Sequence, residues 1–321
     1  MKAFFILHLA SFLLLTYANP LNELDHDELS GKIHTLYQQH YSKYKTYLKK
    51  MGKKHDPSVP EPIRLLKFVQ SLKMIDEHNQ RYSKGLETYK VDLNEMSDWT
   101  EEEKERLHGY YPDLTAKVEG NLTKIIRGNT SIPASRDYTK EIAALPVRRQ
   151  GRCGACFIFS ALGALEMYVA LRTKKAPIEL SVQDVMDCSG VSKCKGIGGN
   201  GPATGREKYG LVDAVYLPPN KEEILKRVLA LYGPISVSLY SSSPSFVAYR
   251  SGIYNDPKCP TDAKKVNHAV VAVGYGVENN TEYFIIRNSW GPTWGQKGYG
   301  RIRAGVFMCG IGRFSNVPIF K

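Results

Sequence analysis

The sequence lacks the features that mark several large classes of protein. No apolar run reaches the roughly 20 residues that span a bilayer. No segment repeats, and no tract is of low complexity. Hydrophobic residues make up 42% of the 321 residues and charged residues 24%, a composition that excludes a disordered or collagen-like chain. The length allows two domains, or one large domain with an accessory region.

Dense basic runs and metal-ligand patterns are also missing. The formal net charge is +12, but residues 1–131 carry 19 basic and 18 acidic residues, whereas residues 132–321 carry 25 and 14. That excess is scattered in ones and twos, which is typical of a solvated surface rather than of a nucleic-acid arm. The cysteines do not combine with spaced histidines as zinc ligands do. We therefore expect no nucleic-acid partner, no metal and no cofactor.

The N-terminus has the pattern of a secretory signal peptide. Lys2 precedes an apolar run from Ala3 to Leu15, and Thr16-Tyr17-Ala18 gives a small-x-small ending. A membrane anchor or an N-terminal core helix is the alternative, but the run is short for a span. We expect residues 1–18 to be removed, no membrane partner, and maturation where cysteines can pair.

Two helices are predicted before a polar linker at 112–131. From Glu61 to Arg81 apolar residues recur at steps of three and four, which indicates one face of an amphipathic helix. Residues 29–48 show a weaker stripe of the same kind. Gly52 and three prolines in the segment 51–62 predict a turn between the two helices.

The pattern changes after Ile132, where all six cysteines and most glycines lie. The segment 156–171 is apolar nearly all round and predicts a buried helix. Shorter helices are predicted at 180–186, with Ser181 as N-cap, and at 221–232. Strands are predicted at 234–239, 268–275, 283–288 and 299–303.

Cys156 differs from the other cysteines in its setting. It lies in the segment 150–157 (QGRCGACF), at the start of the predicted buried helix. The positive end of a helix dipole favours the thiolate, which is the nucleophilic form of cysteine. Taken alone, the residue is better explained as part of a structural disulfide or as a buried thiol, since most cysteines of secreted proteins are paired.

His268 has the most suggestive setting of the eight histidines. It begins a predicted strand, and Asn288 follows in the segment 287–291 (RNSWG). The amide oxygen of Asn288 can accept from one ring nitrogen and fix the tautomer, which leaves the other nitrogen to face the sulfur. Trp290 can cover that hydrogen bond. Taken alone, His268 is compatible with a core histidine.

These three segments, in this order, resemble the papain family of cysteine proteases, and the resemblance covers nearly the whole chain. Family members usually have CGSCW where this chain has CGACF at 153–157. The segments 181–188 (SVQDVMDC) and 288–300 (NSWGPTWGQKGYG) also match, and look most like the lysosomal cathepsins, the cathepsin O branch in particular. The resemblance implies an α+β fold with a helical half, a β-barrel-like half and a cleft between them.

The resemblance also assigns roles to residues. It implies that Cys156, His268 and Asn288 are catalytic and that Gln150 contributes to the oxyanion hole. The residues that it places against the substrate are Gly196, Ala269, Trp290 and Phe314. A bulky ring at Phe314 should make the main specificity pocket shallow, although packing in the core is the alternative. The family's Cys-x-Gly-Gly segment reads CKGI at 194–197, a departure where the substrate strand docks.

The other cysteines are expected to be structural. By resemblance Cys153 pairs with Cys194, and Cys259 pairs with Cys309. Cys188 is then without a partner, because the chain is short between residues 195 and 220. Such an odd thiol could be free or could crosslink chains.

Residues 19–131 resemble the inhibitory propeptide of papain-like zymogens. Four residues match the helical motif, Arg64, Phe68, Ile75 and Asn79, whereas Pro60 and Ser71 depart from it. The segment 92–98 (DLNEMSD) resembles the motif that follows, with departures at its first and fifth residues. By resemblance this region blocks the cleft, and acid should weaken its hold as carboxylates such as Asp98 lose charge. The mature enzyme is expected to begin at Ile132.

We therefore expect a monomeric, secreted or lysosomal cysteine endopeptidase made as a zymogen, with residues 132–321 as the catalytic domain. Its expected partners are protein or peptide substrates, its own propeptide and cystatin-like inhibitors. The alternative is a papain homologue with a damaged cleft that acts as a binding or decoy protein. Three Asn-x-Ser/Thr sequons, at Asn121, Asn129 and Asn279, are candidate glycosylation sites on surface loops.

Overall fold

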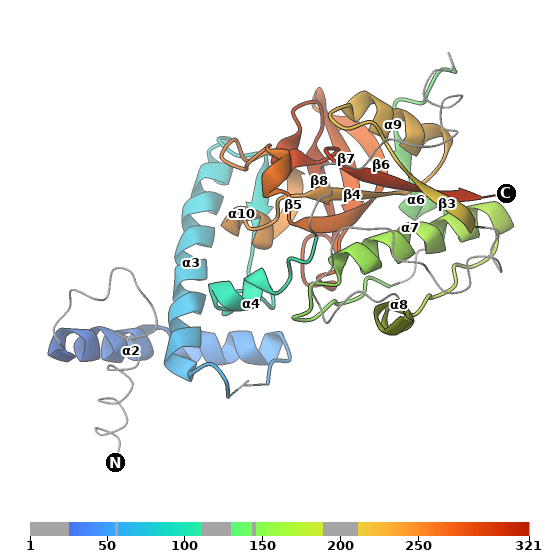
Figure 1. Cartoon of the computed structure of the whole chain (residues 1–321). Coiled ribbons are helices and arrows are strands. Elements are labelled where there is room, and N and C mark those ends of the chain that lie inside the picture. The colour runs from blue at the N-terminus through green and yellow to red at the C-terminus, as the bar shows by residue number, and fades with distance from the viewer. Residues whose placement is uncertain (1–25, 55–56, 111–129, 143–145, 189–210, 321) are drawn as a thin grey trace. The chain divides into compact units, whose positions relative to one another are not determined.

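The computed structural model describes residues 26–54, 57–110, 130–142, 146–188 and 211–320 (Figure 1). The chain divides into two compact units. The first comprises the chain up to residue 74 together with residues 97–100, and the second comprises residues 75–96 and 101–321. The predicted signal peptide at 1–18 and nearly all of the linker at 112–131 lie outside the described residues. The predicted start of the mature chain at Ile132 stays a prediction.

Both helices predicted for the first unit are confirmed. α2 spans His26–Lys50 and α3 spans Glu61–Ser83, of which the part up to residue 74 belongs to this unit. The rings of Tyr44 and Tyr47 pack on that of Phe68, with centroid distances of 5.3 and 4.9 Å. All three side chains are buried, so the aromatic residues that face each other from the two helices form the core of the unit.

The carboxylate of Asp98 is buried against the same two tyrosines. It accepts hydrogen bonds from the hydroxyls of Tyr44 at 3.2 Å and Tyr47 at 3.3 Å, and it pairs with the ammonium of Lys53. Arg64 donates to the backbone carbonyl of Asp98 at 3.4 Å. A fully buried charge persists only where its partners neutralise it and satisfy its oxygens, as they do here.

Replacing Asp98 with asparagine should destabilise the first unit by about 3 kcal/mol, because Lys53 and two hydroxyl donors would lose their anionic acceptor. We expect faster amide hydrogen exchange in residues 61–74 of the full-length protein. Asp92→Asn is the matched control, since Asp92 is exposed. Exchange at the same rate in both variants would contradict this account of the core.

The second unit is built around a mixed sheet. Its strands run in the order β1-β5-β8-β7-β6-β4-β9-β3, and β2 pairs with β6. β5 and β8 run parallel, whereas the remaining pairs are antiparallel. The strands are β1 (Tyr89–Val91), β2 (Arg136–Asp137), β3 (Leu211–Tyr216), β4 (Ile235–Leu239), β5 (Tyr249–Tyr254), β6 (His268–Glu278), β7 (Thr281–Arg287), β8 (Tyr299–Arg303) and β9 (Ser315–Phe320).

The helix α7, Cys156–Thr173, packs on this sheet against β4 and β6 and crosses below it in Figure 1. The sequence predicts no later segment fit to span a membrane, but α7 is long and apolar enough to qualify by length and composition. Its 18 residues are 67% buried within the protein. The expectation that no later segment has the length and composition of a membrane span is therefore wrong for α7. The burial of α7 shows that its apolar side chains pack inside the protein.

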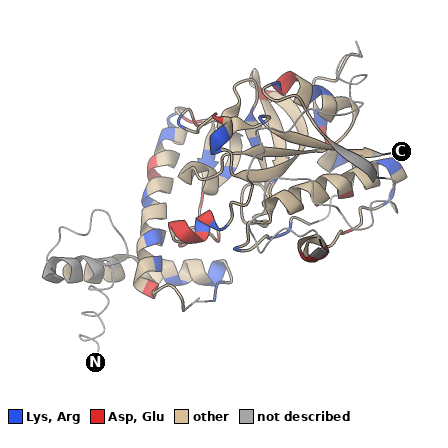
Figure 2. Cartoon of the chain, viewed as in Figure 1, with Lys and Arg blue, Asp and Glu red and all other residues tan. Residues whose placement is uncertain are grey.

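Shorter helices complete the second unit: α4 (Glu101–Glu105), α6 (Tyr138–Glu141), α8 (Val182–Cys188), α9 (Glu222–Leu231), α10 (Pro244–Val247), and the 3₁₀ turns η2 (Ala263–Lys265) and η3 (Met308–Gly310). The hydroxyl of Ser181 accepts from the backbone N–H of Asp184 at 3.0 Å, which confirms the predicted N-cap of α8. Figure 2 shows Lys and Arg residues on many elements and several acidic residues next to one another on α4.

Residues 75–96 fold with the second unit, although the sequence places them in the propeptide. The side chain of Asn79 donates to the carbonyl of Val91 at 2.9 Å and accepts from its N–H at 3.2 Å, which fixes β1 beside the end of α3. β1 then pairs with β5 from Tyr89 to Val91. The motif residue Asn79 thus holds β1 on the sheet of the second unit.

The turn between β6 and β7 carries one of the three sequons. Asn279 and Asn280 are exposed and have left-handed backbones, with φ of 48° and 59°. This is the geometry of a tight hairpin, in which asparagine is favoured. The predicted surface position of Asn279 is confirmed, whereas Asn121 and Asn129 lie outside the described residues.

Candidate active site

Cys156 is the first residue of α7 and is buried with a free thiol. Four backbone N–H groups face the sulfur and favour its anion, those of Ala269, Gly109, Phe157 and Cys156 itself. Ala269 also packs in one buried cluster with Cys156. The fold therefore brings the start of α7 against the start of β6, where His268 stands.

Burial nevertheless dominates the titration of this thiol. It raises the pKa of Cys156 above the ordinary value of 9.0, against the lowering by the four N–H groups. In this form of the protein burial therefore outweighs the helix dipole, which by itself favours the thiolate. Burial of a thiol away from water destabilises the thiolate by more than the helix N-terminus stabilises it.

His268 is fully buried, and its Nε2 lies 2.8 Å from the amide oxygen of Asn288. The same oxygen accepts from the backbone N–H of Ser289 at 2.8 Å, which fixes the orientation of the amide. Nε2 therefore carries the ring proton and donates it to Asn288, and Nδ1 is left with a free lone pair. Nδ1 has no hydrogen-bond partner among the described residues.

Trp290 covers the imidazole as the sequence predicts. Its ring lies 4.8 Å from that of His268, with an angle of 35° between the planes, and it is 2% exposed. Burial lowers the pKa of His268 to about 3, against the raising by its bond to Asn288. The nearby His108 adds to the lowering. Thiol and imidazole are thus both held neutral in this form.

The Gln150 side chain has one end fixed and one end directed at a peptide carbonyl. Its oxygen accepts from the hydroxyl of Ser289 at 2.6 Å. Its Nε2 donates to the carbonyls of Cys153 at 2.8 Å and Leu107 at 2.9 Å. An amide held in this way can hydrogen-bond a carbonyl oxygen that acquires negative charge, as an oxyanion hole requires.

The carbonyl of Leu107 belongs to a segment, residues 107–110, that covers the site. Gly109 directs its N–H at the sulfur of Cys156, and Tyr110 donates to the carbonyl of Asn267 at 3.3 Å. A Cβ at Gly109 would lie 1.6 Å from the carbonyl oxygen of Gly154, so the covered site accommodates only glycine at this position. Sequence reasoning predicted a blocked cleft, but it did not identify these residues.

His108 of the covering segment lies beside the candidate histidine. The two rings are 6.5 Å apart, and Nδ1 of His108 is 3.2 Å from the carboxylate of Glu105 and 3.3 Å from the hydroxyl of Ser242. Burial lowers the pKa of His108, against the raising by Glu105. The segment therefore places a second neutral imidazole in the site.

Phe314 lies at the far side of the covering segment, where its ring is 6.4 Å from that of Tyr110. It packs on the buried cluster that contains Cys156 and Ala269. Its backbone carbonyl accepts from the N–H of Ser238 at 3.1 Å. Phe314 thus contacts both the core cluster and Tyr110 of the covering segment. Its part in a specificity pocket stays a prediction.

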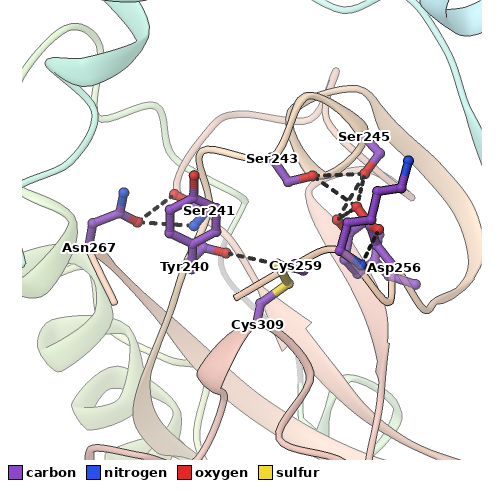
Figure 3. Close-up of a disulfide and its surroundings, with 10 residues drawn as sticks. Tyr240, Ser241, Ser243, Ser245, Asp256, Cys259, Asn267 and Cys309 are labelled. Atoms are coloured by element: carbon purple, nitrogen blue, oxygen red, sulfur yellow. Dashed lines mark hydrogen bonds between the residues drawn. A yellow bond between two sulfur atoms is a disulfide. The ribbon is translucent and has the colours of Figure 1, made fainter. Parts of the chain in front are cut away.

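One predicted disulfide is confirmed, and the pairing of Cys153 with Cys194 stays a prediction. Cys259 and Cys309 are bonded, and Figure 3 shows this bridge with Tyr240 and Asn267 nearby. The amide oxygen of Asn267 accepts from the N–H of Ser241 at 3.0 Å, which ties the residue before His268 to the loop after β4. Cys153 is also disulfide-bonded.

Several predicted residues cannot be placed. Cys194 and Gly196 lie outside the described residues, and nothing is described of the side chain of Cys188 at the end of α8. Within the part of the chain that is described, no group of three or more His, Cys, Asp or Glu side chains is arranged to hold a metal ion.

Comparisons with known proteins match both the N-terminal region and the rest of the chain to known families. Residues 132–204 and 203–319 match the papain family cysteine proteases, and residues 44–103 match the cathepsin propeptide inhibitor domain (I29). A cathepsin L-like peptidase of Aedes aegypti is 32% identical over 89% of this chain and 95% of its own length. Cathepsin K of Mus musculus is 33% identical over 86% of this chain and 92% of its own length.

Solved structures give the same result for the fold. The digestive procathepsin L2 proteinase from the larval midgut of Tenebrio molitor superposes with a TM-score of 0.76, at 26% identity, over 87% of this chain and 99% of that chain. The proform of the ragweed pollen allergen Amb a 11, a cysteine protease, gives a TM-score of 0.72 at 26% identity, over 87% and 92%. The α+β fold with a helical propeptide is therefore confirmed, and the chain belongs to the papain family of cysteine proteases.

Proposed function

We propose that this protein hydrolyses peptide bonds with Cys156, His268 and Asn288 and is made as a zymogen that covers its own site. One observation carries the proposal: a peptide carbonyl, that of Leu107, already accepts the amide N–H of Gln150 at 2.9 Å beside Cys156. Gly109 of the same segment directs its N–H at the sulfur. The covering segment thus occupies the place that a substrate backbone would take.

The proposed reaction starts with a proton transfer from the thiol of Cys156 to Nδ1 of His268. The sulfur then attacks the peptide carbonyl carbon, and the oxyanion is stabilised by the N–H groups of Gln150 and Cys156. The imidazolium returns the proton to the amine nitrogen as the C–N bond breaks, which leaves a thioester. His268 next takes a proton from water, which attacks the thioester and releases the acid and the free thiol. Asn288 holds the imidazole in orientation throughout.

The covering segment explains how such an enzyme would stay inactive before maturation. Burial beneath residues 107–110 favours the neutral thiol and the neutral imidazole rather than the reactive ion pair. Removal of the segment admits water and a substrate carbonyl together. We propose that cleavage between the linker and Ile132 makes this change permanent.

A peptidyl epoxide that alkylates active-site thiols tests the proposal. We expect labelling of the wild-type protein after maturation at acid pH, and no labelling of Cys156→Ala. Cys259 and Cys309 provide an internal control, since their bonded sulfurs should stay unlabelled. If matured wild-type protein resists the probe, the alternative of a binding or decoy protein replaces the proposal.

Phe314 provides a prediction about substrate choice. The Tyr110 ring of the covering segment lies beside Phe314, and after maturation a substrate side chain would take its place. Replacing Phe314 with alanine should deepen this pocket. We expect kcat/KM to rise about tenfold for substrates that put a large aromatic side chain into it. Phe307, which packs under Arg313 elsewhere, is the control for loss of a phenyl ring. Peptide-library profiles that are the same for Phe314→Ala and wild type would place Phe314 in the core only.

The remaining expectations concern the surroundings of the enzyme. We propose passage through the secretory pathway to a lysosome or the exterior, which the predicted signal peptide and the Cys259–Cys309 disulfide support. We propose protein or peptide substrates, the chain's own propeptide and cystatin-like proteins as binding partners, and a monomer as the active species. A glycan on the exposed Asn279 fits the same route.

A further inference from the structure

A single buried carboxylate lies along the helix that carries Cys156. Glu166 is 1% exposed, although α7 is otherwise apolar over most of its length. Its Oε1 accepts from the backbone N–H of Leu180 at 2.9 Å and from Nη2 of Arg148 at 2.8 Å. Its Oε2 lies 3.9 Å from Nη1 of Arg287. Burial of a charge is costly, so a carboxylate kept here invites a functional explanation.

Arg148 links this carboxylate to the oxyanion-hole candidate. It stands two residues before Gln150, and its Nη1 donates to the carbonyl of Leu180 at 2.8 Å. Its guanidinium also stacks on the ring of Phe159, 5.4 Å from the ring centre. The side chain is therefore held on three sides, which fixes the backbone that leads into Gln150.

Arg287 links the same carboxylate to the residue that orients the imidazole. It immediately precedes Asn288, is 6% exposed, and donates from Nη2 to the carbonyl of Pro146 at 3.1 Å. Space for its guanidinium comes from Gly163, one turn before Glu166 on α7, because a Cβ there would lie 3.1 Å from Nη1. Both arginines also line one small cavity with Asn288 and Ser289.

The carboxylate and the two arginines depend on one another. Burial, and to a smaller extent the charge of Glu179, raise the pKa of Glu166, whereas the Leu180 N–H, Arg148 and Arg287 lower it. Neutralising the carboxylate would leave two guanidinium groups against one neutral side chain in the interior, with the exposed Glu179, 3.7 Å from Nη1 of Arg148, as the remaining anion. Like charges there would move apart, and the backbones at 148–150 and 287–289 would move with them.

We propose that Glu166 is a positioning residue, whose carboxylate holds Arg148 and Arg287 so that Gln150 and Asn288 keep their places around Cys156 and His268. The inference rests on the proposed function, because it assigns Glu166 a part in the same reaction without contact to the substrate. It predicts a loss in kcat rather than in substrate affinity, since a misplaced catalytic group costs rate.

The test compares Glu166→Gln with Glu222→Gln, each expressed as the full chain and assayed after maturation. Glu222 is also a buried carboxylate on a helix, and it accepts from the backbone N–H groups of Gly305 and Phe307, away from the candidate site. We expect kcat to fall about 10- to 100-fold in Glu166→Gln with KM within about threefold. We expect Glu222→Gln to stay within about threefold of wild type in kcat.

The pH dependence of Cys156 alkylation by iodoacetamide gives a readout that does not need turnover. Displacement of Asn288 should change the alkylation profile of Glu166→Gln and leave that of Glu222→Gln like wild type. Arg287→Lys keeps a charge at the site and should give an intermediate loss, which keeps the test decisive if Glu166→Gln does not fold. If the wild type does not cleave peptides, the proposed function is wrong. The alkylation profiles would still test whether Glu166 positions the residues around Cys156. Equal kcat and equal alkylation profiles in the Glu166 and Glu222 variants would overturn it.

Discussion

Replacing Cys156 with alanine should lower kcat/KM for peptide hydrolysis by at least about 10⁴-fold. The sulfur forms the covalent intermediate in the proposed reaction, and Gln150 alone can only stabilise an oxyanion that water would have to generate. A fluorogenic peptide assay on the matured protein measures this loss directly. It is the largest effect of a single substitution that we expect.

The control for this prediction is the same substitution at a bonded cysteine pair. Cys259→Ala with Cys309→Ala removes a disulfide that lies outside the described contacts of Cys156, so it should reduce stability and leave the activity of folded protein within about tenfold. Activity retained in Cys156→Ala would require another nucleophile and would contradict the account.

Acid should release the covering segment through His108, with the opening constant rising up to about tenfold per pH unit below 6.5. The opening constant rises in acid because the pKa of His108 is lowered in the covered form. The neutral ring stabilises that form fully above 6.5, and this stability is lost as the pH falls toward the lowered pKa, because the open form binds the proton more tightly. The groups that face His108 are Glu105, Ser242 and His268.

Cys156 and His268 should contribute little to this dependence. The covered form holds one proton on the pair, on the sulfur, and the open form holds one proton on the imidazole. Because the number of protons bound to the pair is the same in both forms, the pair makes no contribution to the pH dependence of the opening constant. His108→Asn should therefore remove most of the acid response that arises in the segment 101–110.

Autoprocessing rates of the wild type and His108→Asn between pH 7 and pH 4.5 measure this response. His78→Asn is the comparison variant, because His78 is buried on α3 and bonds to the carbonyl of Tyr89 rather than facing the candidate site. A response that persists unchanged in His108→Asn would assign the acid sensitivity to other groups and contradict this prediction.

The sequence could predict the long helices best, because a periodic apolar stripe (α3) or a long segment that is apolar all round (α7) leaves a long signal. α7 begins at Cys156 as predicted and α3 at Glu61, and each ends within two residues of the expected position. Strands that lack alternation were missed. β5 contains Arg250, Ser251 and Gly252, and β9 contains Pro318, a residue that usually argues against an interior strand.

The candidate site could be predicted only as a set. Cys156, His268 and Asn288 are unremarkable singly, and their order along the chain identified them together. Leu107 and Gly109 could not be identified, because their backbone atoms make the contacts and backbone contacts leave no pattern of side chains. Glu166 did leave a signal: one acidic residue in the middle of an apolar, buried helix needs a buried partner.

The ionisation of Cys156 after maturation tests the central claim most directly. Absorbance of the thiolate, followed from pH 3 to pH 10, should show the anion already formed in mildly acidic solution once the segment 107–110 has gone, and His268→Ala should abolish it there. A single ionisation near the ordinary value of 9.0, unchanged in His268→Ala, would show that no imidazole shares the proton of this sulfur and would contradict the account.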